Sequence, residues 1–337
     1  MSRSTHGEYA DPLDIIWLSC AARLGLRVVR SDETYASWDG HGTLTLCTAA
    51  AFDPDDSVAQ LVLHELCHAI VQGPERLGKP DWGLENDEAQ ASATEEHACH
   101  RLQAALLDRY GLRRVLAVTT DWRPYWDALP ADPLAAGDDP AIEPAREAWA
   151  RATRGPWSAA LDAALRATAV IARAAAPWAP EGSLFRGVPD AHPLGVATGP
   201  GTCGACAWRT EDHRCLAEAP EGHQGPPVQP DWPGCYRYEP RLDDAACRSC
   251  GACCRQGFHL VAVDEDDPFL THHPELVRRD GWGAHVPRPG GFCAALTAHT
   301  APWTCGVYTE RPRSCRDFEI GEEACLIARR RVGITRR

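Results

Sequence analysis

The chain has 337 residues, of which 44% are hydrophobic, and its formal net charge at pH 7 is −13. This length and apolar content suffice for two domains, each with a core of its own. The acidic balance argues against a nucleic-acid partner, whose phosphates require a basic face. The sequence contains no run of about eighteen apolar residues, so it gives no indication of a membrane partner.

The first elements predicted along the chain are a helix and a β-hairpin. Residues 13–24 place apolar side chains on one helical face, and Gly25 follows as a stop signal. Residues 26–38 and 42–48 read as two strands that flank the turn Asp-Gly-His-Gly.

The next helix carries the strongest terminal signals. Asp53 is suited to cap it, Pro54 fits its first position, and two further aspartates place negative charge near the positive end of the helix dipole. The helix should run to Gln72 and end at Gly73.

Later segments predict more helix and then a change of composition. We expect a helix over residues 87–110, with Gly111 at its end, and two helices within 142–176, separated near Gly155. Residues 177–201 are rich in proline and glycine, as in a linker. Beyond them we expect little regular structure, because bound metals replace part of the core.

The sequence His-Glu-Leu-Cys-His over residues 64–68 is the first candidate metal site. Residues four apart share one helical face, so His64 and His68 can direct imidazole nitrogens at one divalent ion. Glu65 stands beside them as a general base, which is the arrangement of zincins. The competing interpretation is that these are ordinary polar residues of a buried helix.

A catalytic ion needs a third protein ligand and an open position. The segment Ala-Thr-Glu-Glu-His-Ala-Cys-His over residues 93–100 offers several candidates on the following helix. Glu96 is the first choice, because a carboxylate completes a set of two histidines and one glutamate. Alternatives on the same segment are Glu95, His97, Cys99 and His100.

The segment HELCHAIVQGPERLGKPDWG resembles the HExxH segment of the elongation factor P hydroxylase family, with matches at Gly73, Arg76, Asp81 and Gly83. The resemblance implies a zincin-like fold and a metal, iron in that family, used to hydroxylate a modified lysine of a translation factor. Arg76 and Asp81 either brace the histidines or form a surface pair around a turn.

The chain contains sixteen cysteines and no recognisable secretory signal, so we expect a cytoplasmic protein. In a reducing cytosol, clustered cysteines at short spacing favour metal binding over structural disulfides. A secreted disulfide scaffold is the alternative. The cysteines at positions 20, 47, 67 and 99 lie within predicted helices or strands, where small buried hydrophobes are expected.

Four cysteines predict a tetrahedral thiolate site for zinc. A Cys-x-x-Cys pair is followed by two later cysteines, and the four ligands are Cys203, Cys206, Cys215 and Cys235. Unrelated free thiols are the competing interpretation.

Eight further cysteines lie within 79 residues: Cys247, Cys250, Cys253, Cys254, Cys293, Cys305, Cys315 and Cys325. The CxxCGxCC core, Phe292-Cys293, the segment Cys-Gly-Val-Tyr from 305 and the segment Cys-Arg-Asp-Phe-Glu from 315 resemble the YkgJ-like CxxCxxCC family. The resemblance covers residues 247 to about 333 and implies a zinc- or iron-chelating domain.

Thiolate ligands allow two zinc ions here, or zinc and an iron–sulfur cluster. The adjacent Cys253 and Cys254 do not easily share one tetrahedron, so they serve different ions or bridge two.

These observations predict an α+β chain in five parts. They are a zincin-like domain over 1–130, a helical extension over 131–176, a linker over 177–201, a four-cysteine zinc segment over 202–240, and a YkgJ-like cysteine cluster over 241–337. The predicted function is a metalloenzyme that hydrolyses or hydroxylates a protein or peptide substrate, using zinc or iron. A non-catalytic metal-binding, metal-delivery or interaction protein is the alternative.

Overall fold

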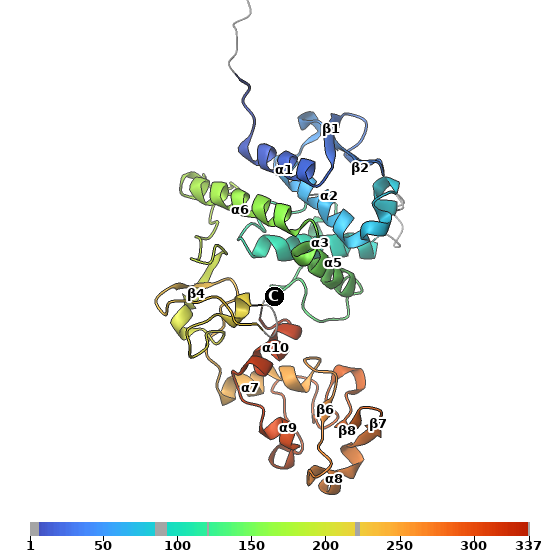
Figure 1. The fold of residues 1–337 in the computed structure, drawn as a ribbon, viewed down its shortest axis with the longest axis vertical. Helices are drawn as coiled ribbons and strands as arrows, with labels where there is room; N and C mark the ends of the chain where they lie inside the picture. The colour runs from blue at the N-terminus through green and yellow to red at the C-terminus, as the bar shows by residue number, and fades with distance from the viewer. Residues whose placement is uncertain (1–6, 85–92, 120, 220–222, 336–337) are drawn as a thin grey trace, which may run out of the picture. The chain divides into compact units, whose positions relative to one another are not determined.

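The computed structural model describes residues 7–84, 93–119, 121–219 and 223–335 (Figure 1). The chain divides into two compact units, one formed by residues 1–134 and 138–198 and the other by residues 135–137 and 199–337. Helices occur together with small sheets, as the predicted α+β class requires. None of the described helices combines the length and apolar character needed to cross a bilayer. The zincin-like fold and the five-part division remain predictions.

The first unit is mainly helical. Its helices are α1 (Pro12–Arg23), α2 (Val58–Gln72), α3 (Ala93–Asp108), α4 (Arg123–Asp127), α5 (Ile142–Arg154) and α6 (Ser158–Ala175), and its strands are β1 (Arg27–Ser31), β2 (Ala36–Trp38) and β3 (Thr43–Cys47). The predicted helix over 13–24 and the pair within 142–176 are confirmed. The expected start of the helix over 87–110 lies partly outside the described residues, and its described part is α3.

The three strands form one sheet in the order β1-β3-β2. The predicted hairpin is confirmed for β2 and β3, which pair antiparallel with Trp38 opposite Leu44. Residues 26–38 are two strands and not one, and β1 pairs parallel to β3. The chain bends after β1, where the Ser31 hydroxyl accepts a hydrogen bond from the Glu33 amide.

Helix α2 is the centre of the first unit, and every one of its residues is buried. Its N-cap is Ser57, whose hydroxyl accepts a hydrogen bond from the Gln60 amide, so the prediction of a cap at Asp53 and a first position at Pro54 is wrong. The Asp56 carboxylate instead closes a turn on the Asp53 amide before the helix begins. The predicted end is confirmed, because Gln72 is the last residue and Gly73 has a φ of 80°.

The other helices pack around α2. Helices α1, α3 and α5 contact it directly, and α6 contacts α1 and α5. Between α1 and α6 the Trp17 indole donates to the Thr168 hydroxyl at 3.0 Å. The four cysteines expected as buried hydrophobes, at positions 20, 47, 67 and 99, all lie in this core.

The second unit is built from short elements. They are β4 (Thr198–Thr202), β5 (Pro233–Cys235), α7 (Asp244–Cys250), β6 (Val261–Ala262), α8 (Phe269–His272), β7 (Arg278–Asp280), β8 (Gly283–Val286), α9 (Arg313–Arg316) and α10 (Glu323–Arg331). Strands β4 and β5 pair, and β6-β8-β7 form an antiparallel sheet. Apolar clusters of this unit include one that contains residues of the β6-β8-β7 sheet and one that contains Ala328 of α10.

Candidate metal centres

Helices α2 and α3 bring three of the predicted ligands together. The Nε2 atoms of His64 and His68 are 3.1 Å apart, and the Glu96 carboxylate oxygens lie 3.3 Å from His64 Nε2 and 3.2 Å from His68 Nε2. Metal bonds of about 2.0–2.2 Å to such donors place neighbouring donors roughly 3.3 Å apart around a tetrahedral ion. The donor set and its spacing therefore fit a divalent ion, with zinc and iron both suited to these donors.

Gln103 fixes which nitrogen of His64 faces this cluster. Its side-chain amide donates to the Leu116 carbonyl at 2.9 Å, so its oxygen points to His64 Nδ1, 3.0 Å away. Nδ1 therefore carries the hydrogen, and in the neutral imidazole the lone pair lies on Nε2, toward His68 and Glu96.

The cluster is buried and electrostatically coupled. Burial opposes the charged form of His64, but the hydrogen bond and charge of Glu96 raise its pKa to about 9. Burial likewise opposes ionisation of Glu96, but the charge of His68 and hydrogen bonds from all three neighbouring histidines hold the pKa of Glu96 far below its usual range. The negatively charged Glu96 carboxylate thus lies between the histidine rings, and this environment favours a bound cation.

His100 lies one turn after Glu96 on the same face of α3 and joins the cluster. Its Nε2 lies 3.0 Å from a Glu96 oxygen, and burial, reinforced by the charges of His64 and His68, lowers its pKa to about 4. Among the described residues, nothing partners Nδ1 of His68 or of His100. His100 is neutral near pH 7 and is placed to hold the Glu96 carboxylate.

The other candidates on α3 are arranged differently. His97 stacks on the ring of Tyr125 with centroids 3.5 Å apart. Cys99 has its sulfur within 4.8 Å of donor atoms of His64 and His68, but burial and the neighbouring Cys67 raise the pKa of its thiol, which donates to the His64 carbonyl. Glu96 therefore fits a metal better than either.

Glu65 is held by a tryptophan that the motif does not reveal. Its Oε2 accepts the indole N–H of Trp82 at 3.0 Å, and Trp82 stacks on Trp38 with centroids 4.3 Å apart. Asp81 and Trp82 both have positive φ, at 46° and 58°, a conformation that is strained for such residues. The Asp81 carboxylate accepts the Trp38 amide at 3.0 Å, so this residue braces the turn that presents Trp82.

Sequence reasoning missed Gln103 and Trp82. A signal for Gln103 was present, because residues 96, 100 and 103 fall on one face of a helix. No comparable signal existed for Trp82, whose contact depends on an unusual backbone turn and on packing against the sheet.

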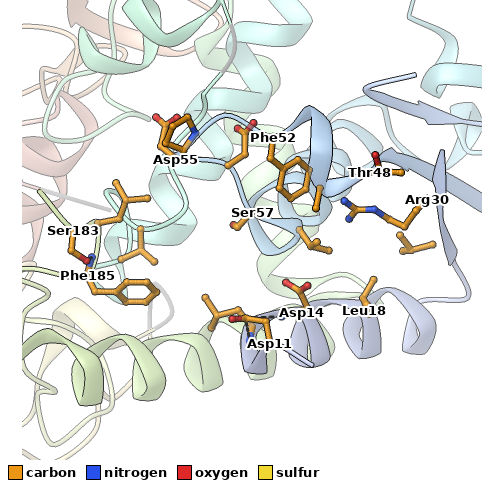
Figure 2. Close-up of a pocket in the computed structure, with 18 of the residues that line it drawn as sticks. Asp11, Asp14, Leu18, Arg30, Thr48, Phe52, Asp55, Ser57, Ser183 and Phe185 are labelled. Atoms are coloured by element: carbon orange, nitrogen blue, oxygen red, sulfur yellow. Dashed lines mark hydrogen bonds between the residues drawn. The ribbon is translucent and has the colours of Figure 1, made fainter. Parts of the chain in front are cut away.

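An open pocket of about 1050 Å³ lies elsewhere in the first unit, where α1 faces residues 48–58 and 182–185 (Figure 2). None of the predicted site residues lines it. Three of its charged groups have partners within the protein: Asp11 caps α1, Asp55 pairs with Arg123, and the Arg30 guanidinium lies over the Phe52 ring. The pocket therefore shares no residue with the predicted sites.

The four cysteines of the predicted zinc segment are all buried. Pairing of β4 with β5 brings Cys203 close to the chain before Cys235, and the Cys203 amide donates to the Trp232 carbonyl at 2.9 Å. Burial, followed by the charges of Cys215 and Cys206, raises the pKa of Cys203 to about 11. Cys235 is likewise influenced by the charges of Cys215 and Cys206, and the zinc site of these four cysteines remains a prediction.

The eight later cysteines all line one cavity of about 480 Å³ in the second unit. The adjacent Cys253 and Cys254 sulfurs are 3.9 Å apart. Within the described ranges, groups of three donor atoms closer than 4.8 Å occur at the histidine centre, and no cysteine of the second unit belongs to such a group. The sulfurs of the second unit are therefore spread more widely than the histidine nitrogens.

A cavity lined by eight thiols defines a cysteine-rich metal-chelating segment. In agreement, residues 246–330 match the model of the CxxCxxCC family, described as "Putative zinc- or iron-chelating domain". This match supports the predicted metal binding and the expected family of the C-terminal segment. No curated protein and no solved structure matches the chain, so the resemblance of the HExxH segment to elongation factor P hydroxylases remains a prediction.

Proposed function

We propose that the protein is a metal-dependent enzyme that hydrolyses amide bonds of a peptide or protein substrate. The observation that carries the proposal is the convergence of His64, His68 and Glu96, from two helices, at the spacing of donors around one ion. The bound ion supplies a Lewis acid that polarises the substrate carbonyl and lowers the pKa of water.

The residues of the chain divide the remaining tasks. Glu65 takes the proton of the attacking water at Oε1 and passes it to the leaving amine, while the Trp82 indole holds Oε2. Gln103 keeps the His64 lone pair on Nε2, and His100 orients Glu96. The cysteine-rich unit binds its own metals.

Replacing Glu65 tests the catalytic assignment. With zinc-loaded full chain and a peptide library, the wild type should generate new peptide N-termini, and Glu65→Gln should generate none while keeping the same zinc content. Glu75→Gln is a matched control, because Glu75 is an exposed glutamate just beyond α2. Cleavage absent from the wild type, or unchanged in Glu65→Gln, would overturn the proposal and favour a non-catalytic metal-binding protein.

Trp82→Phe separates the positioning role from metal binding. Phenylalanine keeps a ring against Trp38 but removes the indole donor to Glu65. We expect a lower kcat, an unchanged KM and an unchanged zinc content. A fall in zinc content would show that Trp82 supports the fold of the site and not the general base.

A second candidate function, oxygen-dependent hydroxylation, is favoured by the donor set itself, because two histidines and one carboxylate also suit Fe²⁺. The same peptide library, incubated aerobically with Fe²⁺-loaded chain, distinguishes the two. Peptides that gain the mass of one oxygen atom without cleavage would identify a hydroxylase.

A further inference from the structure

The eight-thiol cavity is divided between two apolar clusters. Cys254, Cys293 and Cys305 pack with the cluster that contains the β6-β8-β7 sheet, whereas Cys250 and Cys253 pack with the cluster that contains Ala328 of α10. The adjacent residues Cys253 and Cys254 therefore pack against different apolar clusters, and the chain passes from one cluster to the other between them.

Backbone contacts and electrostatics assign the remaining cysteines. The Cys293 amide donates to the Cys254 carbonyl at 2.8 Å, and Cys305 pairs with Leu296 just beyond Cys293. Cys247 is influenced by the charges of Cys253, Cys250 and Cys325. Among the cysteines, Cys293 has the largest influence on both Cys305 and Cys315, and Cys253, which lies where the chain passes between the clusters, influences these two as well. Two sets of four result: the α10 set contains Cys247, Cys250, Cys253 and Cys325, and the sheet set contains Cys254, Cys293, Cys305 and Cys315.

The spread of the sulfurs distinguishes an ion from a cluster. Zinc bonds of about 2.3 Å place thiolates roughly 3.8 Å apart around one ion. Among the described residues, no three donor atoms that include one of these eight cysteines lie within 4.8 Å of one another, and the Cys253 and Cys254 sulfurs, 3.9 Å apart, belong to different sets. A cluster separates its thiolates further, because iron and sulfide ions stand between them. The run Cys247-x-x-Cys250-x-x-Cys253 is also the spacing that bacterial four-iron clusters use, with a remote cysteine as fourth ligand.

The cavity wall carries positive charge suited to an anionic content. Arg288 donates to the Cys253 carbonyl, but its Nε and Nη1 are buried without a partner in the described part of the chain. Arg311 and the exposed Arg248 also line the cavity, as does Arg329, which is paired with Glu239. Four thiolates around a four-iron cluster leave a net negative charge, which the buried guanidinium nitrogens of Arg288 stabilise.

Local backbone geometry supports the α10 set. The Ala252 amide donates to the Cys250 sulfur at 3.3 Å, a bond that favours a thiolate. Gly251 adopts φ +58°, and a Cβ there would meet the Trp303 ring at 2.2 Å. Only glycine therefore turns the chain between Cys250 and Cys253.

We propose that this cavity holds two four-iron iron–sulfur clusters, one bound by the α10 set and the other by the sheet set. The inference does not depend on the histidine centre. The adjacency of Cys253 and Cys254 places the clusters side by side, so their unpaired electrons should interact when both are reduced.

Anaerobically purified full chain tests the proposal by iron and acid-labile sulfide counts, with electron paramagnetic resonance after dithionite reduction. We expect about eight iron and eight sulfide ions per wild-type chain, consistent with two four-iron clusters. Cys247→Ser and Cys315→Ser should each lose half of the iron, and the double variant should lose all of it. The reduced wild type should show spin coupling that is absent from either single variant.

Cys20→Ser is the control, because Cys20 is a buried cysteine of the first unit that donates to the Ala160 carbonyl. It should keep all of the iron. A colourless wild type that contains zinc alone would overturn the clusters. Loss of all iron in both single variants, with the metal of the histidine centre retained, would overturn the division into two sets.

Discussion

Gln103 offers the sharpest test of how the histidine centre is organised. Gln103→Leu removes the acceptor for His64 Nδ1 and the donor to the Leu116 carbonyl, and the Gln103 side chain is fully buried. Each buried group left without a partner costs about 1–3 kcal/mol. Losing the bond that orients a metal-binding histidine typically weakens metal affinity about 10–100-fold.

Gln103→Glu is the matched variant. It keeps an acceptor for His64 Nδ1 but, like leucine, cannot donate to the Leu116 carbonyl when ionised. The difference between the two variants therefore reports the bond to His64 together with the negative charge that glutamate adds beside it. Zinc affinity of the histidine centre would be measured by equilibrium dialysis against a chelator series, with the thiolate sites kept loaded.

We expect Gln103→Leu to bind zinc about 10–100-fold more weakly than Gln103→Glu. Both variants should be less stable than the wild type in the metal-free state, because both leave the Leu116 carbonyl without its donor. Equal zinc affinities in the two variants would refute the role given to Gln103, whatever their stabilities.

Three further predictions follow from single residues. Glu96→Gln should lose one metal ion per chain and no more, as measured by elemental analysis, because the negative charge between the imidazoles disappears. Gly251→Ala should destabilise the second unit by about 1–2 kcal/mol for the left-handed backbone, and further for the clash with Trp303, whereas Gly281→Ala, with open space around it, should melt as the wild type does. Asp139 accepts a hydrogen bond from the Arg101 guanidinium at 2.7 Å. Burial opposes ionisation of Asp139, but this bond outweighs it and lowers the pKa of Asp139 below 3.8 in the folded state, so the stability it adds is present above pH 3.8 and is lost as pH falls through the lower folded value. Urea unfolding at stepwise lower pH should therefore show wild-type stability falling more steeply than that of Asp139→Asn, and parallel curves would contradict this assignment.

Some features of the histidine centre were accessible from sequence, because they depend on local geometry. A helix places residues four apart on one face, so the pairing of His64 with His68 needs no tertiary information. The end of α2 at Gly73 follows from the same kind of local rule. The start of α2 did not, because the Asp53–Asp56 segment closes its own turn and leaves the cap to Ser57.

The sequence by itself determined that two kinds of metal-binding side chain occur, with the spacing of each run. It could not determine which residue of the second helix meets the histidines, because that depends on the rotation of α3 against α2. Packing selected Glu96, turned His97 onto Tyr125, and brought Gln103 beneath His64. The grouping of the eight thiols was likewise decided by the tertiary fold, because ligands far apart in the chain meet only where their elements pack.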